Sequence, residues 1–422
     1  MESGPRGEHA PAGGEWRKGW PLIAAAMLGI GTGPGLFQNL SSLFTPGMVE
    51  EFGWTRGQIA TAAGVGLIGG LAVPFLGRLA DRFGVKPMIV GAMLLLGLAY
   101  CGMAAVEGKI WQYQLLILCL ALSVPGTSAL VYGKLIGAAF ARHRGLALGI
   151  ATSGISISTL VLPPVVGAVI AAHGWRGGFV ALAILTAGIA LPLVLLALRG
   201  RAAAPTRPDP GDATAALPVE GMTGAEARRD GRFWRLALSA LLINLATIGL
   251  VTQLVPFGLD RGLSAGEAAL LLASFGASQV VGRLAIGYLV DHFRPQLMAA
   301  IAAVISCLAF VALQVGEPGF AFAMIAVFAA GLMNGAEHDL MPFFGVRLFG
   351  LRAFGEVYGT LLMIALIGTA TGIVGFGRLH DATGGYDIAL GIAAAALALA
   401  ACLFLSLRDR PLPHVQGAAH PA

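Results

Sequence analysis

Residues 87–106 read PMIVGAMLLLGLAYCGMAAV, a run of 20 residues without a charged side chain. A helix needs about 20 apolar residues to cross a bilayer core. The whole chain shares this character, because 57% of its 422 residues are hydrophobic, 12% are charged, and the mean hydropathy is +0.80. A soluble domain has about 25% charged residues and too small a core to bury so much apolar surface. The composition excludes a soluble enzyme and predicts an all-α membrane protein.

Eleven more apolar runs predict twelve transmembrane helices, six on each side of a polar segment. The twelve fall near 20–44, 58–81, 87–106, 111–134, 145–171, 176–198, 233–257, 266–291, 296–315, 319–346, 355–379 and 386–407. We therefore expect two six-helix halves joined by a linker rich in Pro, Ala, Arg and Asp. The expected units are an N-terminal tail (1–19), a first half (20–198), the linker (199–232), a second half (233–407) and a C-terminal tail (408–422).

Basic residues predict the orientation. Twenty Lys and Arg residues fall on the side of both termini, and only Arg56, Lys109, Arg176 and Arg261 fall in loops on the other. This bias places both termini in the cytoplasm. The pI of 9.2 and net charge of +5 thus reflect topology, and no nucleic-acid partner is expected. With only four lysines in the chain, the Arg-rich composition points to a bacterial inner membrane.

The two halves repeat in sequence. A shift of 210 residues carries Asp81 onto Asp291 and Gly174 onto Gly384, and a shift of 209 aligns Thr55-Arg56-Gly57-Gln58 with Ser264-Ala265-Gly266-Glu267. Both tetrapeptides predict capping boxes at helix starts. Two repeated halves around a central cavity are typical of secondary transporters.

No residue pattern indicates an enzyme, a metal or a cofactor. The four cysteines each lie inside an apolar run without CxxC spacing, which indicates small buried side chains. No nucleophile–base constellation stands out either. These cysteines are Cys101, Cys119, Cys307 and Cys402.

The segment GRLADRFGVK at 77–86 resembles the signature of the loop between spans two and three in the major facilitator superfamily. In that family the cluster latches the outward-facing state, which implies gating roles for Gly77, Asp81 and Arg82. The second copy keeps Asp291 but has His292 in place of the Arg. Arg142, which repeats as Arg352, completes the predicted gating set of Gly77, Asp81, Arg82, Asp291 and Arg142.

Two further motifs resemble the monocarboxylate and oxalate/formate porter branch of that superfamily. FARHRGLALGIATSG at 140–154 is similar to the branch signature in span five, and GRLHDATGGY at 377–386 is similar to the one at span eleven. The resemblance implies a small organic monocarboxylate as substrate. At the outer end of span eleven, we expect His380 and Asp381 to cap the exit turn.

Arg283 is the strongest candidate for binding the substrate. It lies eight residues before Asp291, about 12 Å from the cytoplasmic end of span eight. A guanidinium buried there is costly unless paired, and its planar fork fits a carboxylate. In the family an Arg in a D-x-x-x-R pattern on this span binds the substrate, but here Gln279 replaces the Asp. The alternative is a packed interhelical hydrogen bond.

Glu337 and His338 are the predicted proton-coupling pair. Glu337 lies ten residues before Arg347, about 15 Å from the cytoplasmic end of span ten. Ionised groups near mid-membrane are costly and usually functional. Helical spacing puts Glu337 and His338 on one face, and Asp339 on another with two glycines. A structural network between helices is the alternative, and it fits Asp339 better.

Polar residues in other spans are the remaining candidates for substrate contact. Gln38 stands where many proton-coupled family members have a Lys, and with Asn39 it either binds substrate or joins helices. Asn244 makes span seven polar, and Tyr132 in span four either contacts substrate or anchors at the interface. Lys134 ends span four, where it reaches the headgroups or the cavity. The predicted substrate-binding set is Arg283, Gln38, Asn39, Asn244, Gln279 and Tyr132.

These features predict a monomeric secondary transporter of small organic monocarboxylates in a lipid bilayer, working with protons by alternating access. Because Gln38 and Gln279 replace the expected coupling groups, an anion exchanger of the oxalate/formate kind is the first alternative. Efflux of drugs or metabolites, and signalling without transport, are the others.

Overall fold

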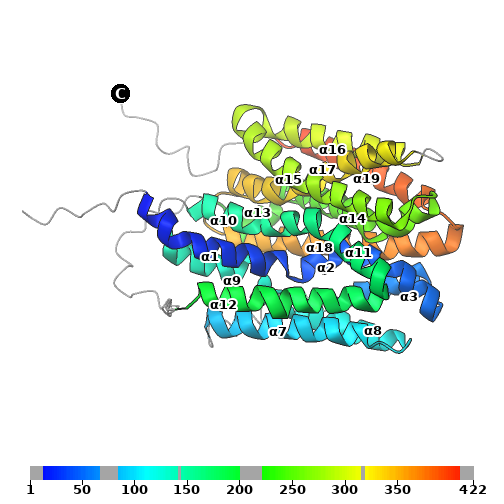
Figure 1. Ribbon diagram of the computed structural model, residues 1–422. Helices are drawn as coiled ribbons and strands as arrows, with labels where there is room; N and C mark the ends of the chain where they lie inside the picture. Colours follow the sequence, from blue (N-terminus) through cyan, green and yellow to red (C-terminus); the bar gives the residue numbers. More distant parts are fainter. Residues whose placement is uncertain (1–12, 67–83, 141–143, 200–220, 315–318, 409–422) are drawn as a thin grey trace, which may run out of the picture.

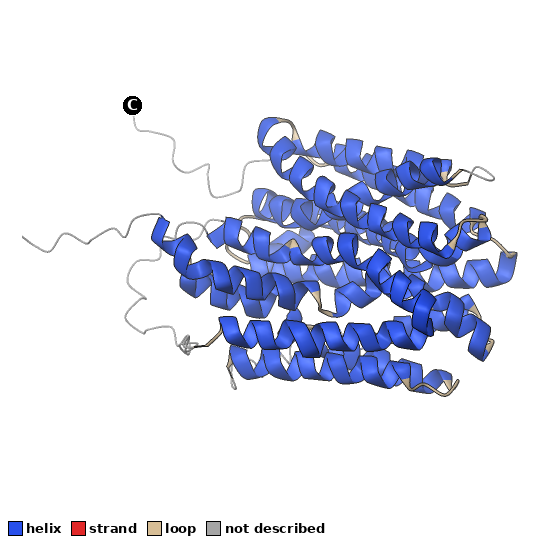
Figure 2. Ribbon diagram, in the orientation of Figure 1, coloured by secondary structure: helices blue, strands red, loops and turns tan. Residues whose placement is uncertain are grey.

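The computed structural model describes residues 13–66, 84–140, 144–199, 221–314 and 319–408. Helices and their connections make up this part of the chain, which holds no named strand (Figure 2). The first half contains α1 (Gly13–Gly31), α2 (Pro34–Leu40), the 3₁₀ turn η1 (Ser41–Leu43), α3 (Thr45–Phe52), α4 (Arg56–Gly64), α7 (Val85–Ala104), α8 (Ile110–Ser123), the 3₁₀ turn η2 (Pro125–Thr127), α9 (Ala129–Ala139), α10 (Arg144–Thr152), α11 (Gly154–Ala183), the π-helical η3 (Ile184–Ala190) and α12 (Leu191–Ala197).

The second half is more regular. It contains the short α13 (Gly224–Arg229) and six long helices. The long helices are α14 (Gly231–Asp260), α15 (Ala265–His292), α16 (Pro295–Ala312), α17 (Phe320–Phe349), α18 (Phe354–Thr383) and α19 (Asp387–Leu405).

The helices match the predicted spans. In the described residues, eight helical segments are long and apolar enough to cross a membrane. The bent pair Gly19–Gly31 and Pro34–Leu43, counted as one span, brings the number to nine. One of the eight, Leu146–Ala197, runs for 52 residues and holds two predicted spans, because Gly174 breaks it with φ at +71°. Helices α8 and α9 form the fourth span, with η2 between them. Helix α4 begins the second span, whose remainder lies outside the described residues.

The repeat between the halves is also present in the structure. Helices α7 and α16 begin at 85 and 295, α8 and α17 at 110 and 320, and α10 and α18 at 144 and 354, each pair 210 residues apart. The capping boxes predicted at Thr55 and Ser264 both form. Gly174 and Gly384 both adopt positive φ, which favours glycine. The all-α fold with two similar halves is therefore confirmed.

The two ends of the bundle differ. We call the end where α12 stops and α14 starts the linker end, on the left in Figure 1, and the opposite end the far end. Toward the far end the halves touch closely, since Gly276 of α15 lies against the backbone at Thr159 of α11. Three turns nearer the linker end, Gly287 on the same face of α15 has nothing within 4 Å of a Cβ position. The described contacts between the halves are therefore tighter toward the far end.

Part of the predicted linker is helical. Thr223 and Glu226 form a capping box that starts α13, and Arg228 forms an ion pair with Glu356 of α18. The amide of Met222 donates to the carbonyl of Phe349, 2.8 Å away. The end of the linker thus packs against the second half, while residues 200–220 lie outside the described part.

Candidate substrate site

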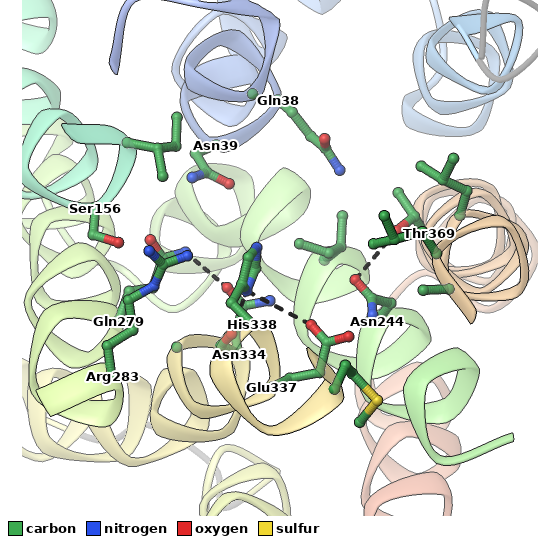
Figure 3. A pocket seen from close by; sticks show the side chains of 18 of the residues that line it. Gln38, Asn39, Ser156, Asn244, Gln279, Arg283, Asn334, Glu337, His338 and Thr369 are labelled. Atoms are coloured by element: carbon green, nitrogen blue, oxygen red, sulfur yellow. Dashed lines mark hydrogen bonds and ion pairs between the residues drawn. The ribbon is translucent and has the colours of Figure 1, made fainter. Parts of the chain in front are cut away.

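A cavity of about 230 Å³ lies between the two halves, midway along the helices (Figure 3). Helices α2 and α11 of the first half line it, together with α14, α15, α17 and α18 of the second. The helix break before Pro34 helps to shape it, because a proline nitrogen cannot donate a helical hydrogen bond and the chain bends there by 47°. The bend lets Gly35, Gln38 and Asn39 line the cavity.

Arg283 lines the cavity without a hydrogen-bond partner. Its side chain makes no hydrogen bond to any described residue, and its Nε atom is both buried and unpaired. Its charge interacts with the carboxylates of Asp339 and Glu337, although neither forms a close ion pair with it in the described structure. An unpaired buried donor on a charged group costs at least about 1 kcal/mol. Arg283 lies in the cavity wall, as predicted, and no described residue takes up its hydrogen-bond donors.

Glu337 and His338 lie side by side in the cavity wall, as predicted. The Glu337 side chain is only 7% exposed, whereas that of His338 is 49% exposed, and a carboxylate oxygen of Glu337 lies 3.6 Å from His338 Nδ1. The same Nδ1 lies 2.9 Å from the Asn334 carbonyl, which can only accept, so Nδ1 carries the hydrogen. The Nε2 atom of a neutral His338 is then an acceptor. Asp339 does not line the cavity, in agreement with its predicted separate face.

Asn334 connects three helices at the cavity wall. Its side-chain oxygen accepts a hydrogen bond from Gln279 Nε2 at 2.8 Å, and its nitrogen donates to Thr247 Oγ1 at 3.0 Å. This network fixes α15, α17 and α14 relative to one another. Gln279 therefore lines the cavity and also uses one donor in a hydrogen bond between helices.

Asn39 and Asn244 behave similarly. Asn39 Nδ2 donates to Thr159 Oγ1 across α2 and α11 at 2.8 Å, and Asn244 Nδ2 donates to the Ala240 carbonyl at 2.9 Å. Both side chains line the cavity, and the Oδ1 atom of Asn39 accepts no hydrogen bond from a described residue. Gln38 also lines it, and no hydrogen bond from its side chain is present in the described structure.

Several predicted residues lie away from the cavity or outside the described structure. Tyr132 is fully buried, and its hydroxyl lies against Gly29 of α1, so the prediction that it contacts substrate is wrong for this conformation. Asp291 is exposed at the end of α15, beside a surface hollow at the linker end. The other gating residues, Gly77, Asp81, Arg82 and Arg142, lie outside the described residues, and the Lys134 side chain is not described.

Sequence reasoning missed several uncharged lining residues, among them four with long or polar side chains. Ser156 and Met341 lie on opposite sides of the cavity, and Tyr358 and Thr369 come from α18. Thr369 Oγ1 donates to Asn244 Oδ1 at 3.4 Å. Met341 lies four residues after Glu337 on α17, so the helical spacing places both on one face. Ser156, Tyr358 and Thr369 are uncharged, and nothing in the sequence distinguishes them from polar residues that only hydrogen-bond to the backbone of their own helix.

Another polar cluster closes the far end of the bundle, and we call it the far-end seal. Arg56 of α4 pairs with Asp260 of α14, donates to the Tyr386 hydroxyl at 2.8 Å and lies 3.0 Å from His380 Nε2. Asp381 accepts from the backbone amide of Gly57 at 3.0 Å. The side chains of His380 and Asp381 thus join the two halves, although we expected them to cap the exit turn, and only the His380 carbonyl does so, by accepting from the Gly384 amide at 2.8 Å. The seal consists of Arg56, Gly57, Asp260, His380, Asp381 and Tyr386.

A membrane-embedded helical bundle of two repeated halves around a central polar cavity is the architecture of a secondary transporter. A family model for the Major Facilitator Superfamily matches residues 22–342. The chain therefore belongs to the major facilitator superfamily and is a membrane transporter, not an enzyme.

Known relatives show which branch of the superfamily this chain resembles. The chain is 28% identical to human monocarboxylate transporter 11, over 96% of this chain and 85% of that protein. It is 25% identical to rat monocarboxylate transporter 3, over 94% and 81% of the two chains. Within the superfamily it thus resembles the monocarboxylate transporters, as the sequence motifs predicted.

Solved structures agree on the fold. A bacterial homologue of the human lysosomal transporter Spinster, crystallised inward-facing and unoccupied, superposes with a TM-score of 0.71, covering 95% of this chain and all of that one at 17% identity. A nucleoside transporter, NupG, also gives 0.71, covering 92% and 98% at 14% identity. These similarities concern the fold.

Proposed function

We propose that this transporter carries organic monocarboxylates, and that Arg283 binds the carboxylate group. The position of Arg283 in the cavity wall, with no hydrogen bond from its guanidinium to a described residue, is the observation on which the proposal rests. A guanidinium can donate two parallel hydrogen bonds to a carboxylate, and such charge-assisted bonds are among the strongest in proteins. The resemblance to monocarboxylate transporters supports the same substrate class.

The charges around Arg283 support coupling of transport to protons. The charges of two carboxylates, on Glu337 and Asp339, interact with this one cation. When both are ionised, the site carries a net negative charge and repels an anionic substrate. A proton on Glu337 removes one of these negative charges and leaves Arg283 available. Substrate anion and proton therefore favour each other's binding, as symport requires.

Alternating access would move the two halves about the central site. The far-end seal closes one side, and the twenty-to-four distribution of basic residues supports a cytoplasmic linker end. The described conformation would then face the cytoplasm. Gly77, Asp81, Arg82, Asp291 and Arg142 keep their proposed gating role at the linker end, in a monomeric transporter of the bacterial inner membrane.

The alternative is exchange of anions without protons. The neutral amides Gln38 and Gln279 line the cavity, and this favours exchange because neither can carry a proton. Uptake into proteoliposomes distinguishes the two mechanisms. Symport predicts that an inward proton gradient drives accumulation of a carboxylate without any internal anion. Uptake that requires internal anion and ignores the gradient would contradict symport.

Drug efflux is a third possibility, and a substitution tests it. Transport of apolar drugs would tolerate Arg283→Ala, whereas carboxylate transport would not. A thermal-shift screen of organic acids on the wild type and Arg283→Lys identifies the substrate. If no carboxylate raises the melting temperature of the wild type, the proposed substrate class is wrong.

A further inference from the structure

A second hollow adjoins the candidate site on its far-end side. It has a volume of about 350 Å³ and shares four lining residues with the site cavity: Gly35, Gln38, Leu366 and Thr369. We call it the apolar chamber. Helices α2, α4 and α8 line it from the first half, and α14 and α18 from the second. The chamber therefore lies between the two halves, as the site cavity does.

The lining of the chamber is chemically different from that of the site. None of its described lining residues is charged, and most are apolar or glycine, including Phe37, Ile117, Leu120 and Ile373. Its hydroxyl groups already have acceptors, since Ser41 donates to the Gln38 carbonyl, Thr252 to the Ile248 carbonyl and Thr369 to Asn244 Oδ1. The chamber thus offers apolar contacts and few free donors.

The far-end seal lies beyond the chamber. Arg56 and Gly57 of the seal open helix α4, and the chamber residues Ala63 and Gly64 follow two turns later on the same helix. On the other half, Asp381 of the seal lies about two turns beyond Ile373 on α18. Because the two spaces share four lining residues, the chamber adjoins the central cavity on the side of the closed seal.

We propose that the transporter's substrates are amphipathic monocarboxylates, with the carboxylate at Arg283 and an apolar chain or ring in the chamber. This inference rests on the proposed function. The site cavity alone, at about 230 Å³, is smaller than the 300–1,000 Å³ typical of pockets for drug-sized ligands, whereas the adjoining chamber adds about 350 Å³. The apolar body displaces water from the chamber as it binds, so affinity should grow with its length.

A chain-length series tests the proposal. Dissociation constants for straight-chain acids from acetate to octanoate are measured by competition on the full-length protein in nanodiscs. Burial of each methylene contributes about 0.8 kcal/mol, so each added carbon should strengthen binding up to about fourfold until the chamber is full. Alkyl alcohols of equal length control for partition into lipid, and they should not compete.

Two substitutions test whether the dependence of affinity on chain length arises in the chamber. Ala370→Leu, at its α18 wall, should weaken octanoate binding about tenfold and leave acetate unchanged. Ala395→Leu, exposed on α19, is the matched control. If Ala370→Leu does not fold, Ile117→Ala enlarges the chamber from the other half and should shift the preference to longer chains.

The outcomes separate this inference from the proposed function. Affinity that depends on Arg283 but not on chain length would overturn the chamber and keep carboxylate transport. Failure of every acid to bind would overturn both. A chain-length effect that Ala370→Leu and Ile117→Ala leave unchanged would place the apolar body elsewhere and contradict the proposal.

Discussion

Two arginines at the boundary between the halves differ in their contacts, one in the far-end seal and the other in the candidate substrate site. Arg56 in the far-end seal contacts Asp260, Tyr386 and His380, and its side chain is 19% exposed. Arg283 in the central cavity has no hydrogen bond to a described residue, and its Nε is buried and unpaired. The first arginine is satisfied by the protein itself. The second lacks the partner that a carboxylate ligand would provide.

Substitution of Arg283 should produce the largest effect. Loss of one member of a buried charge pair costs about 2–5 kcal/mol, so Arg283→Ala should slow carboxylate uptake by about 100-fold or more. Arg283→Lys should retain part of the rate, because it keeps the charge but not the planar fork. Initial rates in proteoliposomes measure both. Uptake near the wild-type rate in Arg283→Ala would show that this arginine is only structural.

Glu337→Gln should uncouple transport from protons. The amide mimics the protonated acid, so carboxylate exchange should persist while accumulation driven by a pH gradient falls by about tenfold or more. Counterflow and gradient-driven uptake, measured on the same vesicles, separate the two activities. Glu51→Gln is the matched control, because Glu51 is exposed and lies outside the cavity lining. Unchanged gradient-driven uptake in Glu337→Gln would rule out Glu337 as the coupling group.

Breaking the seal should affect conformation more than binding. The Arg56–Asp260 pair is partly exposed, so Arg56→Ala should lower the free energy of unfolding by about 1 kcal/mol. The affinity for carboxylate should change little. When Arg56→Ala is combined with Ala370→Cys, the introduced cysteine should react faster with a membrane-impermeant thiol reagent added from the far-end side. Arg176→Ala is the control, since its pair with Glu51 lies within one half. Equal labelling in both variants would show that Arg56 does not hold the halves together.

The ion pair between Arg176 and Glu51 should show the smallest effect, which is a dependence of protein stability on pH. The hydrogen bond from Arg176 holds the pKa of exposed Glu51 below its usual value. A carboxylate whose pKa is lower in the folded state stabilises the fold above its unfolded pKa and loses that contribution as pH falls through the folded pKa. The melting temperature of the wild type should therefore fall toward that of Glu51→Gln below about pH 4.5. Parallel curves from pH 7 to 3 would contradict this.

The sequence predicted the charged part of the site better than the rest. Arg283 and Glu337 stand out because ionised groups are costly inside apolar spans. The repeat also predicted the capping boxes at Thr55 and Ser264, and both form. Tyr132 was misplaced because an aromatic residue in a span is equally compatible with packing between helices.

The far-end seal could not be predicted from local patterns. Arg56 and Asp260 are 204 residues apart, and their pairing depends on how the halves meet. The GRLHDATGGY motif was noticed, but its physical role became clear only in three dimensions. Gly377 lets α18 approach Arg56 and Gly57, Asp381 binds the Gly57 amide, and Tyr386 binds Arg56. Burial also raises the pKa of the Tyr386 phenol, which keeps this group neutral.

The affinity for a carboxylate as a function of pH tests the central claim most directly. The probe is the acid that most raises the melting temperature, and the range, pH 6 to 9, keeps that acid ionised. We predict that the dissociation constant rises with pH, approaching tenfold per unit once Glu337 is deprotonated, and that Glu337→Gln abolishes this dependence. A dissociation constant that does not change with pH in the wild type, or a slope that persists in Glu337→Gln, would contradict binding of the anion at Arg283 coupled to a proton on Glu337.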